Sequence, residues 1–163
     1  MLNFIPLTEE HRTTVIDIFN FYIRTTNSAY RRNELAYSDY NIFLENANKL
    51  CGFVIKNTNN DTVGFCQLKP YSPVNTFEQT VEITYFLLPE HTGKGIGKEV
   101  LDYLIAQAKD RNIKHILASI SGDNIVSQKF HSKNGFVECG RFKNIGYKNG
   151  KAFDIVYMQR DIE

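Results

Sequence analysis

The sequence predicts one α/β domain, of the α+β kind, covering residues 1–163. Apolar residues recur in short runs typical of strands, and elsewhere at the three- and four-residue spacing of amphipathic helices. The predicted elements follow in the order β-α-α-β-β-β-α-β-α-β-β, which departs from the regular alternation of a doubly wound dinucleotide-binding fold. A hydrophobic content of 42% is ordinary for a globular chain of this length, which is large enough to bury a core.

The first part of the chain is predicted to form a short strand and two helices. The strand at 2–5 ends before a proline. A helix at 8–23 begins with Thr8 as its N-cap, because acidic residues follow in the first turn and apolar residues then share one face. A second helix is expected at 38–50, opened by a serine and an aspartate.

The middle of the chain is predicted to be mostly strand. Strands at 52–56 and 62–69 are joined by the polar turn 57–61, a pattern typical of a hairpin. A loop at 70–75 contains two prolines. The run at 81–88 is apolar, β-branched and aromatic, which indicates a buried strand.

The remaining elements are predicted from the same patterns. They are a helix at 95–111, a strand at 115–121, a helix at 124–133 stopped by an Asn-Gly pair, and strands at 136–142 and 153–158.

Composition excludes several classes of protein. The formal net charge of +1 gives no support to nonspecific nucleic-acid binding. No stretch approaches the roughly 20 apolar residues of a membrane span, and the N-terminus lacks the pattern of a secretion signal. The three cysteines are an odd number without metal-like spacing, so we expect reduced thiols, a cytoplasmic location and no metal.

The most informative motif is the turn at 91–98, between the strand at 81–88 and the helix at 95–111. Gly93, Gly95 and Gly97 alternate with other residues and are accompanied by Lys94 and Lys98. Glycine lets the backbone approach a ligand closely, and the free N–H groups at a helix start point at an anion. The turn therefore predicts a phosphate-binding site.

Three kinds of phosphate ligand compete for this turn. A triphosphate loop would need a hydroxyl residue after Gly97-Lys98, where Glu99 stands, and a dinucleotide loop would need a different glycine spacing. The pattern [QR]-x-x-G-x-[GA] of acetyl-CoA-binding N-acetyltransferases matches at both glycines, with Thr92 in place of Gln or Arg. A flexible surface turn is the remaining alternative.

Over its whole length the chain resembles the GNAT superfamily, and within it the phosphinothricin N-acetyltransferase branch. The segments that carry the resemblance are 18–23 with 25–30, 80–87 with the glycine turn, 124–127 with 130–136, and 146–150 with Asp154 and 158–161. The resemblance implies a mixed, mostly antiparallel central sheet flanked by about four helices. It also implies a homodimer and direct transfer of acetyl from acetyl-CoA to an amine.

Glu82 and His131 are the candidate catalytic residues. An unperturbed alkylamine titrates near 10.4, so a base must remove its proton before it can attack. Glu82 matches the catalytic glutamate of the family, although alone it would fit a solvent-facing strand position. His131 matches the family's histidine near the acyl group and could assist proton transfer, or be an ordinary polar helix residue. Its neighbour Phe130 replaces the tyrosine that many members use as an acid.

The resemblance also assigns the cofactor contacts. Backbone groups of Tyr85, Phe86 and Leu87 should bind the pantetheine arm as an added strand. The pyrophosphate should receive the N–H groups of Gly93, Lys94, Gly95, Ile96, Gly97 and Lys98. Asn124 should hydrogen-bond the pantetheine, cap the following helix, or do both.

The acceptor is the least determined part of the prediction. The family places aromatic residues there, for which Tyr30 and Tyr71 are the candidates. Relatives that acetylate phosphinothricin-like amino acids carry a basic residue just after the position of Tyr71, where this chain has Ser72-Pro73-Val74. Lys69 is an alternative carboxylate partner.

The predicted function is therefore acetylation of the primary amine of a small molecule, such as an amino acid or an analogue of phosphinothricin or methionine sulfoximine. The alternatives are a non-catalytic acyl-CoA-binding module and a protein or peptide N-acetyltransferase.

Overall fold

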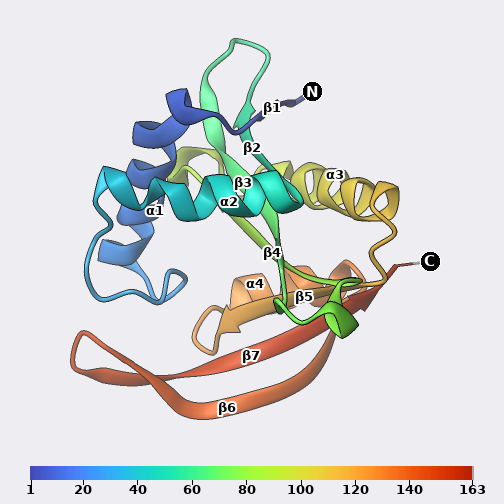
Figure 1. Cartoon of the computed structure of the whole chain (residues 1–163). Helices are drawn as coiled ribbons and strands as arrows, with labels where there is room; N and C mark the ends of the chain where they lie inside the picture. The colour runs from blue at the N-terminus through green and yellow to red at the C-terminus, as the bar shows by residue number, and fades with distance from the viewer. Residues whose placement is uncertain (163) are drawn as a thin grey trace.

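The computed structural model, described for residues 1–162, is built on one seven-stranded sheet with helices on both faces (Figure 1). The strands are β1 (Asn3–Pro6), β2 (Cys51–Lys56), β3 (Thr62–Pro70), β4 (Thr80–Leu87), β5 (His115–Ser121), β6 (Val137–Lys148) and β7 (Lys151–Asp161). The α-helices are α1 (Arg12–Thr25), α2 (Asn41–Lys49), α3 (Ile96–Asp110) and α4 (Ile125–Lys133).

The sheet has the strand order β1-β2-β3-β4-β5-β7-β6. Its one parallel pair is β4 with β5, and the other neighbouring strands of the described chain run antiparallel. The mixed, mostly antiparallel sheet flanked by four helices confirms the predicted fold class.

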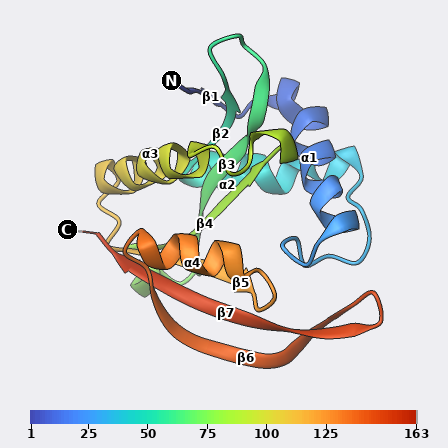
Figure 2. The ribbon, with the colours of Figure 1, turned by 180° about the vertical axis from the view of Figure 1, so that it is seen from behind.

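Two apolar cores lie on opposite faces of this sheet. Helices α1 and α2 cover one face, and α3 and α4 cover the other (Figure 2). Because successive side chains of a strand point to opposite faces, β4 contributes to both layers. Val81, Ile83 and Leu87 enter the core beneath α3, whereas Phe86 packs with the core beneath α1 and α2.

The predicted elements are all present, with shifts at their ends. The two C-terminal strands are longer than expected and form a hairpin closed by Asn149 and Gly150, which both have positive φ. Ser38 and Asp39 lie in a 3-10 turn, Tyr37–Tyr40, that precedes α2. Within residues 1–162, none of the helices has the length and apolar character that crossing a membrane requires.

One feature of the sheet positions the site. The parallel pairing joins Thr80–Glu82 only to His115–Leu117, and within the described chain β4 and β5 do not pair beyond Glu82. Strand β5 instead continues along β7 as far as Ser121. The second half of β4 therefore presents a backbone edge at the centre of the sheet.

Candidate active site

The glycine turn has the conformation of an anion-binding loop. Gly93 and Gly95 have φ of 71° and 80°, a left-handed region that side chains other than glycine rarely adopt. Gly95 is the N-cap of α3, and the first N–H groups of a helix have no acceptor within it. The backbone of this turn can therefore donate several hydrogen bonds to one anion.

The two lysines of the turn differ in their surroundings. Lys94 is exposed, between the two glycines of positive φ. The ammonium of Lys98 lies 2.5 Å from a carboxylate oxygen of Asp102, one turn further along α3. The backbone N–H of Lys98 donates a hydrogen bond of 3.0 Å to the carbonyl of Gly95. Both the backbone donor predicted for the pyrophosphate and the side chain of Lys98 are therefore already paired.

The exposed edge of β4 follows Glu82. It contains the backbone of Tyr85, Phe86 and Leu87, and the 3-10 turn Pro89–His91 joins it to the glycines. The hydroxyl of Tyr22 in α1 donates a hydrogen bond of 2.5 Å to the carbonyl of Leu87. This bond ties the end of β4 to α1 and occupies one of the acceptors predicted for the cofactor.

Glu82 is the last residue of β4 that pairs with β5. Its carboxylate lies 2.5 Å from the ammonium of Lys69, its direct cross-strand neighbour on β3. The Glu82 side chain keeps 16% of its surface exposed, so an incoming amine can reach it. The arrangement places one negative and one positive group side by side where β4 and β5 separate.

His131 is buried in α4, with 3% of its surface exposed. Its Nδ1 lies 2.8 Å from the carbonyl of Ser127, which can only accept, so Nδ1 carries the proton. Burial lowers the pKa of His131, and its neutral Nε2 accepts a hydrogen bond of 3.2 Å from the Tyr85 hydroxyl. The ring packs edge-on against Phe130 and Phe136.

The two candidate catalytic residues lie on opposite faces of the sheet. Tyr85 lies three positions after Glu82 along β4, an odd number, so the two side chains point in opposite directions. Tyr85 packs against the core beneath α3 and contacts His131, whereas Glu82 points to the layer of α1 and α2. His131 therefore reaches the site through Tyr85.

Tyr30 lies on the same face as Glu82. Its hydroxyl is 3.0 Å from the hydroxyl of Ser119 on β5, and its ring packs against Phe153 with a centroid separation of 6.0 Å. Burial, with Glu82 among the neighbouring acidic groups, raises the pKa of Tyr30 to about 12. The hydroxyl is therefore a neutral donor or acceptor near pH 7.

The other predicted contacts lie further out. Tyr71 is exposed just beyond the end of β3, where its ring meets that of Phe77 edge-on. Asn124 accepts the N–H of Ser127 at 3.1 Å, which is the capping role considered for it, and donates to the hydroxyl of Ser28 at 3.1 Å. Asn124 thereby joins the start of α4 to the segment after α1.

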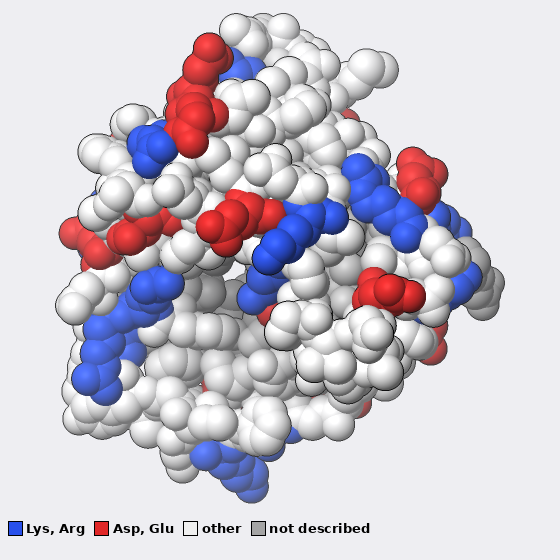
Figure 3. Space-filling view, in the orientation of Figure 1, with Lys and Arg blue, Asp and Glu red and all other residues white. Residues whose placement is uncertain are grey.

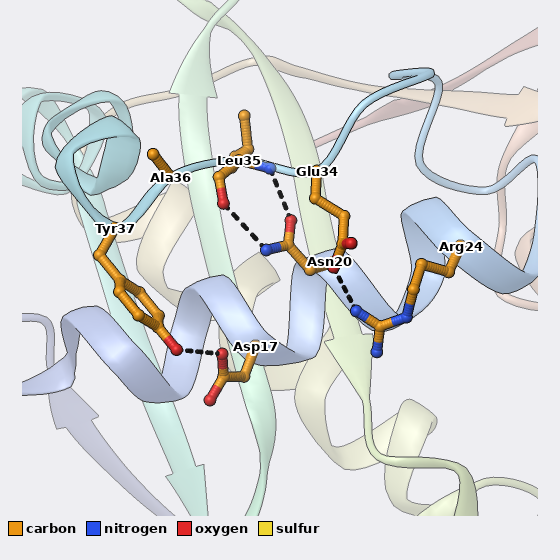
Figure 4. Close-up of a pocket in the computed structure, with 7 residues that line it drawn as sticks. All are labelled: Asp17, Asn20, Arg24, Glu34, Leu35, Ala36 and Tyr37. Carbon is orange, nitrogen blue, oxygen red and sulfur yellow. Dashed lines mark hydrogen bonds and ion pairs between the residues drawn. The ribbon is translucent and has the colours of Figure 1, made fainter.

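The surface is hollowed on the face of the molecule that Figure 1 presents. Figure 3 shows this hollow between α1 with its following segment and the β6–β7 hairpin, with Lys and Arg side chains on its rim. A second pocket lies elsewhere, between α1 and residues 34–37 (Figure 4). Its polar side chains bond one another or nearby backbone: Tyr37 donates to Asp17 at 3.0 Å, and Asn20 pairs with the backbone of Leu35. This pocket is therefore a weaker candidate for chemistry than the surroundings of Glu82, where β4 and β5 separate.

Comparisons with known proteins agree with this geometry. The model of the acetyltransferase (GNAT) family matches residues 15–136, which is more than half of the chain. The chain belongs to the GNAT acetyltransferase family. Its GNAT fold and N-acetyltransferase class follow from this membership and confirm the resemblance seen in the sequence.

Two curated relatives are similar to this GNAT protein along most of its length. It is 26% identical to the L-amino acid N-acyltransferase MnaT of Escherichia coli K12, over 91% of this chain and 87% of that protein. It is 25% identical to the phosphinothricin N-acetyltransferase of Streptomyces viridochromogenes, over 97% of this chain and 86% of the relative. A crystal structure of a phosphinothricin acetyltransferase from Sinorhizobium meliloti in complex with AcCoA superimposes with a TM-score of 0.93. It is 21% identical over 99% of this chain and 88% of that one.

Three residues of this GNAT site were not predicted. Ser119 and Phe153 hold Tyr30, and Lys148 binds the segment that carries it. The alternation of β5 could have placed Ser119 opposite the core residues of that strand, since Ala118 and Ile120 are buried. No comparable local signal distinguishes Lys148 from an exposed hairpin lysine.

Proposed function

We propose that this GNAT protein transfers acetyl directly from acetyl-CoA to the primary amine of a small amino acid or amino-acid analogue. The observation that carries the proposal is the separation of β4 from β5 immediately after Glu82. The opened edge can take the pantetheine amides as an added strand, and the glycine turn at its end can take the pyrophosphate. The acetyl carbon then lies beside the carboxylate that deprotonates the amine.

The roles of the side chains follow from their faces. Glu82 accepts the proton of the incoming ammonium, and the free amine attacks the thioester carbonyl as the bond to sulfur breaks. The Tyr85 hydroxyl and His131 lie on the cofactor side of β4, where His131 holds Tyr85 in place. Tyr30 and Tyr71 line the acceptor side. The released thiolate takes a proton from solvent or from this polar network.

The charges beside the opening favour an acceptor that carries both an amine and a carboxylate. Glu82 and Lys69 lie as a pair of opposite charges, 2.5 Å apart. An amino acid can place its ammonium on Glu82 and its carboxylate on Lys69. Lys69 then supplies the positive charge that Ser72-Pro73-Val74 lacks. The two relatives named for amino-acid and phosphinothricin acylation support this class of acceptor.

The test measures thiol release from acetyl-CoA with a panel of amines. The panel contains L-amino acids, methionine sulfoximine, phosphinothricin, the decarboxylated amine of each, a polyamine and a peptide. We expect turnover with amino-acid-like amines and much less with amines that lack the carboxylate. In Lys69→Met this preference should disappear, whereas Lys109→Met, an exposed lysine of α3, should behave as wild type. Equal turnover of an acid and its decarboxylated amine by the wild type would refute the carboxylate contact.

We also propose that the protein forms a homodimer through the edge of β6. This strand is one of the two outer strands of the sheet and exposes Val137, Phe142 and Ile145 to solvent. An edge strand has backbone groups without a partner on one side, which can pair with another strand. Sedimentation velocity should show a dimer for the wild type and a monomer for Ile145→Lys, while a monomeric wild type would overturn the proposal.

A further inference from the structure

Lys148 is a buried lysine at the end of β6, with 2% of its surface exposed. Its ammonium donates two hydrogen bonds to backbone carbonyls, of 2.7 Å to Thr26 and 2.8 Å to Ala29. Among residues 1–162 no carboxylate forms an ion pair with it. Burying a charge is costly unless it is well bonded, so these two contacts must offset the loss of water around the ammonium.

The position of the ammonium explains why a charged group fits there. Thr26 is the C-cap of α1, and the carbonyl groups at the C-terminal end of a helix carry partial negative charge. Burial lowers the pKa of Lys148, while the helix end and the two carbonyls favour its protonated form. Lys148 therefore caps α1 from a strand that lies far away in the sequence.

The segment bound in this way, residues 26–32, is here called the acceptor strap. Besides its bonds to Lys148, the strap is held by the β6–β7 hairpin at its other end. There the Arg32 side chain donates a hydrogen bond of 3.0 Å to the carbonyl of Tyr147. Within it lies Tyr30, whose hydroxyl meets Ser119 on the face of Glu82. The motif Gly-Tyr-Lys-x-Gly at 146–150 thus contacts both ends of the strap.

We propose that Lys148 is a positioning residue for the acceptor side of the active site. It fixes the acceptor strap across the opening and so sets the place of the Tyr30 ring and hydroxyl opposite Glu82. The kinetic part of this inference rests on the function proposed above, because it assumes that Tyr30 lines the acceptor site. The conformational part does not, since it concerns only whether the strap is held.

The test uses Lys148→Met, which keeps an unbranched side chain as long as the lysine stem and removes the ammonium. Lys151→Met, an exposed lysine three residues further along the same hairpin, is the matched control. Trypsin can cleave after Arg31 and Arg32 in the strap and after Lys94 in the glycine turn. We expect strap cleavage to be at least about tenfold faster in Lys148→Met, with cleavage after Lys94 unchanged. The Lys151 variant should match wild type at all three sites.

The kinetic arm measures the two substrates separately. Lys148→Met should raise KM for the amine by about tenfold or more and leave KM for acetyl-CoA unchanged, because the cofactor lies on β4 and the glycine turn. Lys148→Arg, which restores a buried cation with several donors, should recover part of this loss. A merely structural role would instead raise both KM values and speed all three cleavages together, and that outcome overturns the proposal.

The two arms separate the possible failures. Unchanged strap cleavage in Lys148→Met overturns the inference whether or not the protein acetylates any amine in the panel. If the wild type acetylates none of them, the function proposed above fails, and faster strap cleavage alone still supports the hold on the strap. If Lys148→Met does not fold, the same measurements are made on Lys148→Gln, which removes the charge and keeps a side-chain amide with N–H donors.

Discussion

The glycines of the turn before α3 should respond in opposite directions to the same substitution. Gly95 has φ of 80°, and a Cβ added there would meet no atom within 4 Å. The cost of Gly95→Ala therefore comes from the left-handed backbone alone, about 1–2 kcal/mol. Gly97 lies in the first turn of α3, where an added Cβ would contact the Phe130 ring at 3.6 Å, an ordinary van der Waals distance. Gly97→Ala should therefore stabilise the protein, by up to about 1 kcal/mol.

The strain in Gly95→Ala can appear in either of two measurements. If the free turn keeps its conformation, unfolding in urea becomes easier by about 1–2 kcal/mol and acetyl-CoA binds as before. If the free turn relaxes, stability is retained and binding must restore the strained form, which weakens acetyl-CoA binding roughly 5- to 30-fold. The two losses should together equal about 1–2 kcal/mol, whichever way they divide.

Urea unfolding of the free protein and calorimetric titration with acetyl-CoA measure both terms. Gly140→Ala is the control, because a Cβ there also meets no atom within 4 Å and its φ is not positive. If Gly95→Ala matches wild type in both measurements, the left-handed turn does not exist in solution. If Gly97→Ala destabilises the protein, α3 does not begin where the structure places it.

Three further predictions concern the two faces of the sheet. Glu82→Gln should lower kcat by about 10²–10⁴ and keep acetyl-CoA binding, and an unaltered pH–rate profile would exclude Glu82 as the base. The depressed pKa of His131 means that below about pH 6.5 only the unfolded state takes up its proton, so stability should fall as the pH drops from 7 to 5. Urea unfolding at pH 7 and pH 5 measures this loss of stability. The free energy of unfolding should fall less in His131→Gln than in the control His91→Gln, and an equal fall in both variants would show that His131 is not buried. Gly146→Ala should cost about 1–3 kcal/mol in the same assay, because the added Cβ would overlap the ring of Phe153, and a stability equal to wild type would place that ring elsewhere.

The sequence predicted those features that local patterns determine. The strand at Glu82, the glycine turn and the helix after it each depend on a few neighbouring residues, and all three lie where they were expected. Asn124 likewise caps its helix through a contact only three residues away. Such features follow from backbone geometry and from the spacing of apolar side chains.

The remaining features depend on contacts between distant parts of the chain. The separation of β4 from β5 is set by β5 following β7, which enters the sheet about 40 residues later. The burial of His131 depends on Phe136 and Tyr85, and that of Lys148 on the end of α1. A lysine that bonds two backbone carbonyls has the same sequence pattern as a solvated one.

In the proposed function, the alternation of one strand lets the two substrates meet without sharing a binding surface. Glu82 points to the face proposed for the acceptor, and Tyr85, three positions later, points to the opposite face, where it contacts His131. Side chains an odd number of positions apart on a strand lie on opposite faces of the sheet. Any substrate that contacts both must therefore pass through the opening between β4 and β5. Inserting one residue between them would bring both side chains to one face. If the proposed function is right, this insertion should abolish transfer even where the rest of the fold is retained, because the proposed base and the proposed cofactor side would no longer lie on opposite sides of the opening.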